Sequence, residues 1–227
     1  IMSSDWSSDV CSSDLFAAEE SVLDKLELYG IHTDTREYDN LPDTGARLDW
    51  AASRFALQEV ISRIADKKGI KTEEINAVKD ENGRMILKHG SEIMDDIQVS
   101  LSHSSGWGFV GVSSSCNERI GVDIESMEER DSSFTERTFS ESERAVIGDY
   151  CERVPISAED ASTVVYSCRE ALFKALHRED ISLNDIILQH IDISGTAEFK
   201  LFSRPEDRYT AYFYLFDKKV ISAATAT

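Results

Sequence analysis

The chain has 227 residues, which is enough for one or two domains with a substantial core. It carries 24 basic and 43 acidic residues, a net charge of −19, so its surface repels nucleic acid and anionic membranes, and neither is expected as a partner. Its four cysteines show no zinc-like spacing. No apolar run approaches membrane-spanning length and no export-signal pattern is present, so a cytoplasmic location is expected.

Residues 1–15 differ in composition from the rest of the chain. Ser-Ser-Asp recurs three times there without helical or strand periodicity, and such a segment buries too little to order itself. We therefore interpret residues 1–15 as a disordered, non-native leader without a role. The remainder divides into an N-terminal half, 16–117, and a C-terminal half, 118–227.

Two helices are predicted in the N-terminal half. Residues 16–29 favour a short helix, and residues 44–68 favour a long amphipathic helix that ends at Gly69. Arg47 and Arg54 are seven residues apart and so share a face of the long helix. A solvated helix face explains both arginines equally well.

A turn and two strands follow. Residues 81–84 form a turn signal, with Arg84 at the start of a short strand that ends near Lys88. Residues 97–102 and 109–112 alternate as strands. Ser102 and His103 are adjacent, so they point to opposite faces and do not form a nucleophilic pair. His103 is either a structural histidine or a phosphate contact.

The most informative stretch is the strand 120–125, in which Asp123 and Glu125 share one face. Two neighbouring carboxylates repel each other unless a positive charge lies between them, and a divalent cation held by oxygen ligands is the usual solution. The alternative is a solvated strand edge.

Two helices supply further candidates. Ser140 and Glu143 fit a capping box at a helix start, which competes with a catalytic role for Glu143. Residues 166–174 favour a helix in which Glu170 and Lys174 lie one turn apart. A surface ion pair is the alternative interpretation of the latter two residues. Strands are predicted at 186–192, 197–203, 209–216 and 219–225.

Together these elements predict an α+β fold. Each half has a helix of four or more turns followed by alternating strands, which predicts a pseudo-duplicated arrangement of two halves with a cleft between them. Each helix is expected to pack on a small antiparallel sheet. Three acids and a lysine would then form a metal site that also binds phosphate.

The order of SLSHSSGW, IGVDIE, FSESE and YSCREALFKAL resembles the 4′-phosphopantetheinyl transferase superfamily, and its larger two-half type in particular. The resemblance covers roughly residues 40–190. It implies transfer of the 4′-phosphopantetheine arm from coenzyme A to a serine of an apo acyl or peptidyl carrier protein, with release of adenosine 3′,5′-bisphosphate. Such holo-carrier-protein synthases serve siderophore, peptide and polyketide synthesis, and the larger type generally works as a monomer.

The resemblance also implies roles for single residues. Asp123, Glu125 and Glu170 would hold Mg²⁺ or Mn²⁺, and Lys174 would hold the pyrophosphate. Glu143 would take the serine proton. The coenzyme A contacts implied by the resemblance are Arg47, Arg54, Arg84, Ser102, His103, Arg169 and Lys174.

The sequence departs from the family pattern at three places: Arg169 replaces a lysine, Gly83-Arg84-Met85 replaces Gly-Lys-Pro, and Tyr166 opens the last motif. None of these changes removes an expected metal ligand. Because carrier proteins are typically acidic, docking is expected to use Arg54, Arg84, Arg169 or nearby apolar loops. The rival functions are a non-catalytic module that binds coenzyme A or a carrier protein, and a metal-dependent phosphohydrolase.

Overall fold

The computed structural model describes residues 35–115, 118–127 and 133–226. In the N-terminal part the elements are α2 (Thr35–Asp39), α3 (Thr44–Lys68), η2 (Thr72–Glu74), β1 (Ile75–Lys79), β2 (Met85–His89), β3 (Glu92–Ile93), β4 (Gln98–Ser104) and β5 (Trp107–Ser113). There follow β6 (Arg119–Ser126), α4 (Ser133–Thr138), α5 (Glu141–Arg153), α6 (Ala158–Leu176), η3 (Leu183–Asp185), β7 (Ile186–Asp192), β8 (Thr196–Leu201), β9 (Arg204–Phe216) and β10 (Lys219–Ala226). None of the helices in these ranges has the length and apolarity needed to cross a membrane.

The long predicted helix is confirmed as α3, with both of its ends set by local chemistry. The Asp43 side chain accepts a hydrogen bond from the Ala46 amide at 2.8 Å, which satisfies a free donor at the helix start. Gly69 ends the helix with a left-handed φ of 67°, a conformation that glycine adopts without penalty. The predicted helix 16–29 and the leader 1–15 lie outside the described residues.

Three antiparallel sheets carry the strands. The largest has the order β6-β10-β9-β8-β7, a second pairs β4 with β5, and a third has the order β1-β2-β3. The predicted strands of both halves are confirmed within a few residues at their ends. Strands β1 and β3 were not predicted, because β1 (INAVK) and the two-residue β3 lack a clear alternation of apolar and polar residues.

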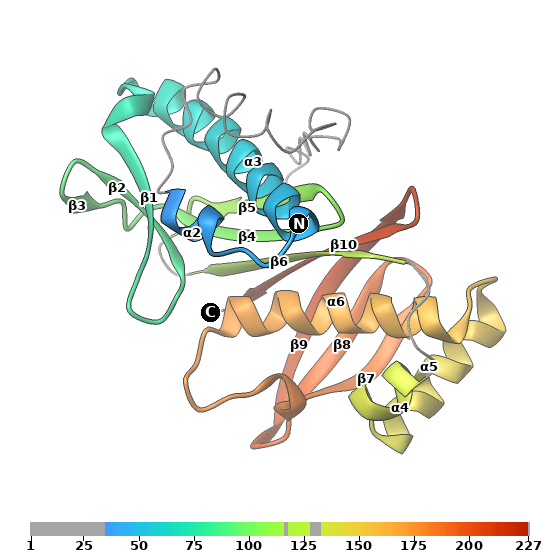
Figure 1. The fold of residues 1–227 in the computed structure, drawn as a ribbon. Helices are drawn as coiled ribbons and strands as arrows, with labels where there is room; N and C mark the ends of the chain where they lie inside the picture. The colour runs from blue at the N-terminus through green and yellow to red at the C-terminus, as the bar shows by residue number, and fades with distance from the viewer. Residues whose placement is uncertain (1–34, 116–117, 128–132, 227) are drawn as a thin grey trace.

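Strand β6 lies at the centre of the molecule (Figure 1), and it is therefore buried on both faces. Gly121 lies on the face with Asp123 and Glu125 and packs directly on α6: a Cβ there would approach the Ala171 carbonyl oxygen to 1.9 Å. On the opposite face Val122 lies against Gly111 of β5. Asp123 is therefore buried against the helix, and the solvated-edge interpretation is wrong for it, whereas Glu125 near the end of the strand is partly exposed.

Strand β4 lies beside β6 and binds it through two serines. Ser100 and Ser102 are two residues apart and so share one face of β4. The Ser100 hydroxyl oxygen accepts a hydrogen bond from the Val122 amide at 3.0 Å, and the Ser102 hydroxyl donates to Asp123 at 2.8 Å. These bonds join the N-terminal strands to the sheet that carries the acids.

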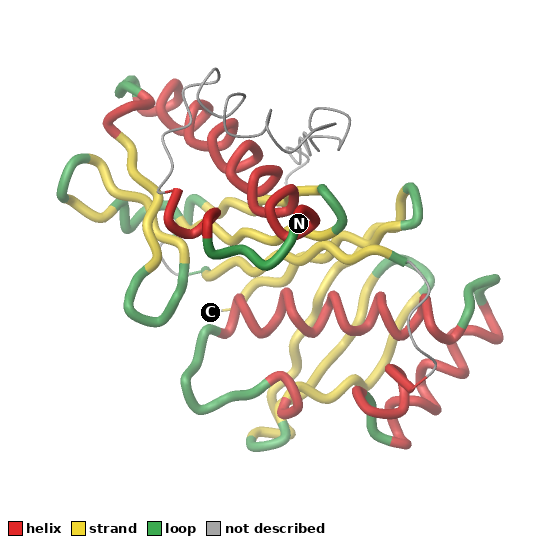
Figure 2. The backbone as a smooth tube through the Cα atoms, viewed as in Figure 1, coloured by secondary structure: helices red, strands yellow, loops and turns green. Residues whose placement is uncertain are grey.

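The structure is of the mixed α+β kind expected from the sequence. Figure 2 shows α3 crossing the β4–β5 pair and α6 crossing the five-stranded sheet. Gly108 of β5 allows the first contact, since a Cβ there would lie 2.3 Å from the Ala52 carbonyl oxygen of α3. The pseudo-duplication of the two halves stays a prediction.

Replacing Gly121 tests the contact between β6 and α6. In Gly121→Ala the new methyl group overlaps the backbone at Ala171 and Ala175, which must move apart. We expect a loss of about 3 kcal/mol in the free energy of unfolding, measured by urea denaturation. The control is Gly148→Ala in α5, where a Cβ meets no atom within 4 Å; stability should be unchanged or higher. Equal stability of the two variants would contradict the close packing of β6 on α6.

Candidate active site

The Asp123 carboxylate is the most buried acid of the predicted metal site, with 4% of the residue exposed. Its Oδ1 accepts hydrogen bonds from Lys174 Nζ at 2.8 Å and from Ser102 Oγ at 2.8 Å. Its Oδ2 is buried and has no hydrogen-bond partner. A buried carboxylate oxygen without a partner is energetically costly, so this atom is a candidate ligand for a cation.

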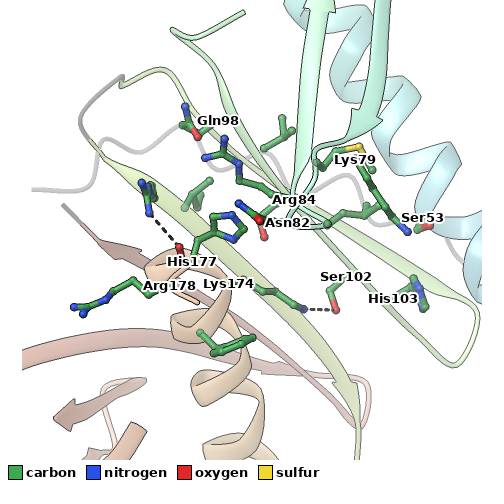
Figure 3. Close-up of a pocket in the computed structure, with 18 of the residues that line it drawn as sticks. Ser53, Lys79, Asn82, Arg84, Gln98, Ser102, His103, Lys174, His177 and Arg178 are labelled. Carbon is green, nitrogen blue, oxygen red and sulfur yellow. Dashed lines mark hydrogen bonds between the residues drawn. The ribbon is translucent and has the colours of Figure 1, made fainter. Parts of the chain in front are cut away.

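Lys174 reaches from α6 across to the strands. Besides Asp123, its ammonium group donates to the Val122 carbonyl at 3.1 Å and to Ser102 at 3.3 Å, the contact drawn in Figure 3. The surface pair of Glu170 with Lys174 that the helical spacing allows is therefore replaced by a pair with Asp123. A desolvated carboxylate gains more from a nearby cation than an exposed one does.

Glu170 is held by Tyr166, one turn earlier on α6. The Tyr166 hydroxyl donates to Glu170 Oε1 at 2.9 Å. Burial raises the pKa of Tyr166, and the negative charges of Glu170, Glu125 and Asp123 raise it further. Of the three acids that the sequence singled out, Glu170 contacts the Tyr166 hydroxyl directly, and Glu125 and Asp123 act on it through their charge.

The donor set suits a hard divalent cation, because it consists of carboxylate oxygens and includes the free Asp123 Oδ2. In the described part of the chain, no three His, Cys, Asp or Glu side chains are already arranged as a complete set of metal ligands. Lys174 and Ser102 occupy one oxygen of Asp123, and Tyr166 occupies one oxygen of Glu170. Asp123 Oδ2 and the second oxygen of Glu170 are the atoms available to a cation.

Glu143 lies in a separate network that is buried except at Ser140. The capping box is present: Glu143 Oε2 accepts from the Ser140 amide at 3.0 Å, and the Ser140 side chain caps α5. Its Oε1 accepts from the Leu188 amide at 2.9 Å and pairs with the Arg169 guanidinium. With the residue only 3% exposed, this carboxylate has no open approach for a substrate proton, so the structure favours the capping role over the catalytic one.

Arg169 is the partner of Glu143 and is 2% exposed. It also donates to the Thr138 carbonyl at 3.1 Å and lies 4.6 Å from the centre of the Phe139 ring. Burial lowers the pKa of Arg169, and Glu143 opposes that shift. The charged head of Arg169 is enclosed by α4, α5 and Phe139, which argues against the expected contact with coenzyme A or a docking partner.

A cleft of about 650 Å³ opens beside the acids. It is bordered by α3, the β1–β2 hairpin, β4 and the C-terminal end of α6. Five of the predicted ligand contacts line it: Arg54, Arg84, Ser102, His103 and Lys174. Among the described residues, Arg47 is not part of this lining; its guanidinium lies 5.4 Å from the Tyr38 ring centre.

Several basic residues of the cleft were missed by the sequence analysis. Lys79, Arg119, His177 and Arg178 also line it, and Figure 3 shows His177 near Arg84. His177 is brought there by its left-handed φ of 42° at the end of α6. Burial and the neighbouring Arg84 lower its pKa. These residues come from distant segments, so only their basic character was visible in the sequence.

Two acids, Glu37 and Glu179, lie among the basic residues of the cleft, and Glu37 is bound directly to them. Glu37 of α2 accepts hydrogen bonds from Arg54 at 2.6 Å, Lys79 at 2.8 Å and the Trp50 indole at 3.1 Å. The hydrogen bond from Lys79 is the main reason that its pKa falls to about 2, with burial opposing the shift. Glu37 is therefore charged at physiological pH and occupies cations that could bind an anionic ligand.

Comparison with known proteins supports the resemblance at the superfamily level. Residues 119–224, from β6 into β10, match the family described as the 4′-phosphopantetheinyl transferase superfamily. The matched region contains Asp123, Glu125, Glu170 and Lys174. None of the curated proteins compared with the chain matches it. The larger two-half type stays a prediction.

The buried pair of Glu143 and Arg169 predicts a large effect on stability. In Glu143→Gln the Arg169 charge is left buried without its counter-ion, which we expect to cost about 3–5 kcal/mol of unfolding free energy. Urea denaturation measures this, with Glu141→Gln in the exposed first turn of the same helix as the control. If Glu143→Gln is as stable as the control, the structural role of Glu143 is wrong.

Glu37 predicts a gain in anion binding when its charge is removed. In Glu37→Gln, Arg54 and Lys79 lose the carboxylate that competes with an anionic ligand. Inorganic pyrophosphate should therefore bind roughly two- to fivefold more tightly, which corresponds to about 0.5–1 kcal/mol of binding free energy. Titration calorimetry measures this affinity. Asp39→Asn makes the same charge change on the exposed side of α2 and should have a smaller effect. Equal affinities for the two variants would contradict competition by Glu37.

Proposed function

We propose that the protein transfers the 4′-phosphopantetheine group from coenzyme A to a serine of an apo carrier protein. The observation that carries this proposal is the double contact of Lys174. Its ammonium group lines the basic cleft and also pairs with Asp123 in the acid cluster. A phosphate-bearing ligand in the cleft would therefore bring its phosphates to the acids that are suited to a cation.

The cleft fits the charge of coenzyme A. The chain as a whole is strongly acidic, yet the cleft is lined by Arg54, Lys79, Arg84 and Lys174. Clustered cations in a concave, partly dehydrated site bind phosphates and raise the local concentration of an anionic ligand. We propose that Lys174 binds the pyrophosphate and that Arg54, Arg84 and His103 bind the remaining part of coenzyme A.

A divalent cation fits the acid cluster through Asp123, Glu125 and Glu170. When bound, Mg²⁺ or Mn²⁺ would neutralise charge on the pyrophosphate and orient it. The side chains of the protein have their own roles beside the cation. Lys174 holds one oxygen of Asp123 and would exchange its long contact with Ser102 at 3.3 Å for a phosphate oxygen. Ser102 fixes the same carboxylate, and Tyr166 fixes Glu170.

The proposed reaction is a single displacement at phosphorus. The carrier serine oxygen forms a bond to the phosphorus that bears the pantetheine arm, and the bond from that phosphorus to the bridging oxygen breaks. Adenosine 3′,5′-bisphosphate leaves with that oxygen and its electron pair, and the serine proton passes to solvent. Glu143 takes no part in this scheme, because its carboxylate is enclosed by Arg169, Ser140 and the Leu188 amide.

Carrier proteins have to approach an acidic enzyme. We propose that they dock at the rim of the cleft, where the side chains of Lys79, Arg84 and Arg178 are 54%, 33% and 26% exposed. Arg169 is excluded from this surface by its burial. Carriers of siderophore, peptide or polyketide synthesis are the proposed substrates, and a single chain supplies both walls of the cleft.

One assay tests the proposal. The protein is incubated with coenzyme A, Mg²⁺ and an apo carrier protein, and the carrier is analysed by mass spectrometry. We expect a mass gain of one phosphopantetheine group on its serine. Asp123→Asn and Glu170→Gln should lower the rate by roughly 100-fold or more while the fold is retained, because each removes a charge from the cation site.

The same assay separates the rival functions. Breakdown of coenzyme A without labelling of the carrier would identify a phosphohydrolase. Binding of coenzyme A without either reaction would identify a binding module. Either result, obtained with several carrier proteins of different types, would contradict the transferase proposal.

A further inference from the structure

Tyr166 is fixed in place by packing on one side and by a carboxylate on the other. Its ring meets Phe134 of α4 at 5.6 Å between ring centres with an angle of 72°, an edge-to-face contact. Phe134 in turn packs against Phe139 at 6.3 Å. The ring is therefore held by an aromatic cluster, and its hydroxyl points along α6 to Glu170 Oε1.

The ring packing alone does not require the hydroxyl group. A phenylalanine at position 166 would keep the contact with Phe134, so the polar atom has its effect at the acid cluster. The hydroxyl lies within electrostatic reach of Asp123 and Glu125 as well as Glu170. It donates to one oxygen of Glu170 and leaves the other carboxylate oxygen for a further partner.

A fixed carboxylate is a better ligand than a mobile one. Glu170 has three rotatable side-chain bonds, and ordering such a side chain on binding costs free energy. A hydrogen bond made before binding reduces that cost and selects one orientation of the carboxylate. Because Tyr166 and Glu170 are four residues apart on α6, the helix itself maintains this geometry.

We propose that the Tyr166 hydroxyl is a positioning group that orients Glu170 as a ligand for a divalent cation shared with Asp123 and Glu125. This inference rests on the proposed function, which supplies the cation site. Tyr166 acts through Glu170 and does not contact the reacting atoms. Its substitution should therefore change cation affinity and leave the binding of coenzyme A to the cleft unchanged, since Tyr166 is not among the residues that line the cleft in the described part of the chain.

The test is direct measurement of Mn²⁺ binding by electron paramagnetic resonance, in the full chain and without turnover. Tyr166→Phe removes only the hydroxyl, and we expect it to weaken Mn²⁺ binding roughly tenfold. Tyr166→Leu is a second variant, without any side-chain hydrogen-bond donor, and should weaken binding similarly if Tyr166→Phe does not fold. The matched control is Tyr150→Phe, which removes a hydroxyl from a buried tyrosine of α5 and should bind Mn²⁺ like the wild type.

The outcomes separate this inference from the function on which it rests. Wild-type Mn²⁺ affinity in Tyr166→Phe, together with weak binding in Glu170→Gln, would overturn the positioning role and leave the cation site standing. Wild-type affinity in Glu170→Gln and Asp123→Asn as well would remove the cation site and the proposed mechanism with it. Equal weakening in Tyr166→Phe and Tyr150→Phe would show a general loss of stability and would also overturn the positioning role.

Discussion

The buried carboxylate of Asp123 is the constraint on which the rest of the site depends. A charge removed from water destabilises a protein unless it is paired and hydrogen-bonded. Here one oxygen receives Lys174 and Ser102, from the helix α6 and the strand β4, so three elements are held together by one group. The second oxygen stays without a partner, which is costly for stability and useful for binding a cation.

Backbone packing makes this arrangement possible. Gly121, two residues before Asp123, brings β6 against the backbone of α6 at Ala171 and Ala175. With a side chain at position 121 the strand would stand farther from the helix, and the reach of Lys174 to Asp123 would lengthen. The glycine of the motif thus acts through the distance between two elements, whereas the aspartate acts through its charge.

Much of the fold was predictable because its signals are local. The cap at Asp43, the glycine stop at Gly69 and the capping box of Glu143 each depend on residues a few positions apart. The shared face of Asp123 and Glu125 follows from strand periodicity alone. The match of residues 119–224 to the transferase superfamily agrees with the resemblance seen in the motifs of that region.

The remaining features depend on tertiary contacts that no local pattern contains. Arg169 is next to Glu170 in the sequence, yet its position on α6 turns it into the core, where Glu143 neutralises it. The cations of the cleft come from β1, β6 and the end of α6, and Glu37 reaches them from a short helix. Helical spacing likewise offered Glu170 as the partner of Lys174, whereas burial made Asp123 the stronger partner.

We propose that acids from β6 and α6 hold one cation beside a cleft that binds a diphosphate. A crystal structure with coenzyme A and Mn²⁺, with data collected at the manganese absorption edge, tests it most directly. We expect one anomalous peak in contact with Asp123 Oδ2, a Glu170 oxygen and the pyrophosphate, with Lys174 on the same phosphates. A manganese peak away from Asp123, or coenzyme A bound outside the cleft, would contradict it.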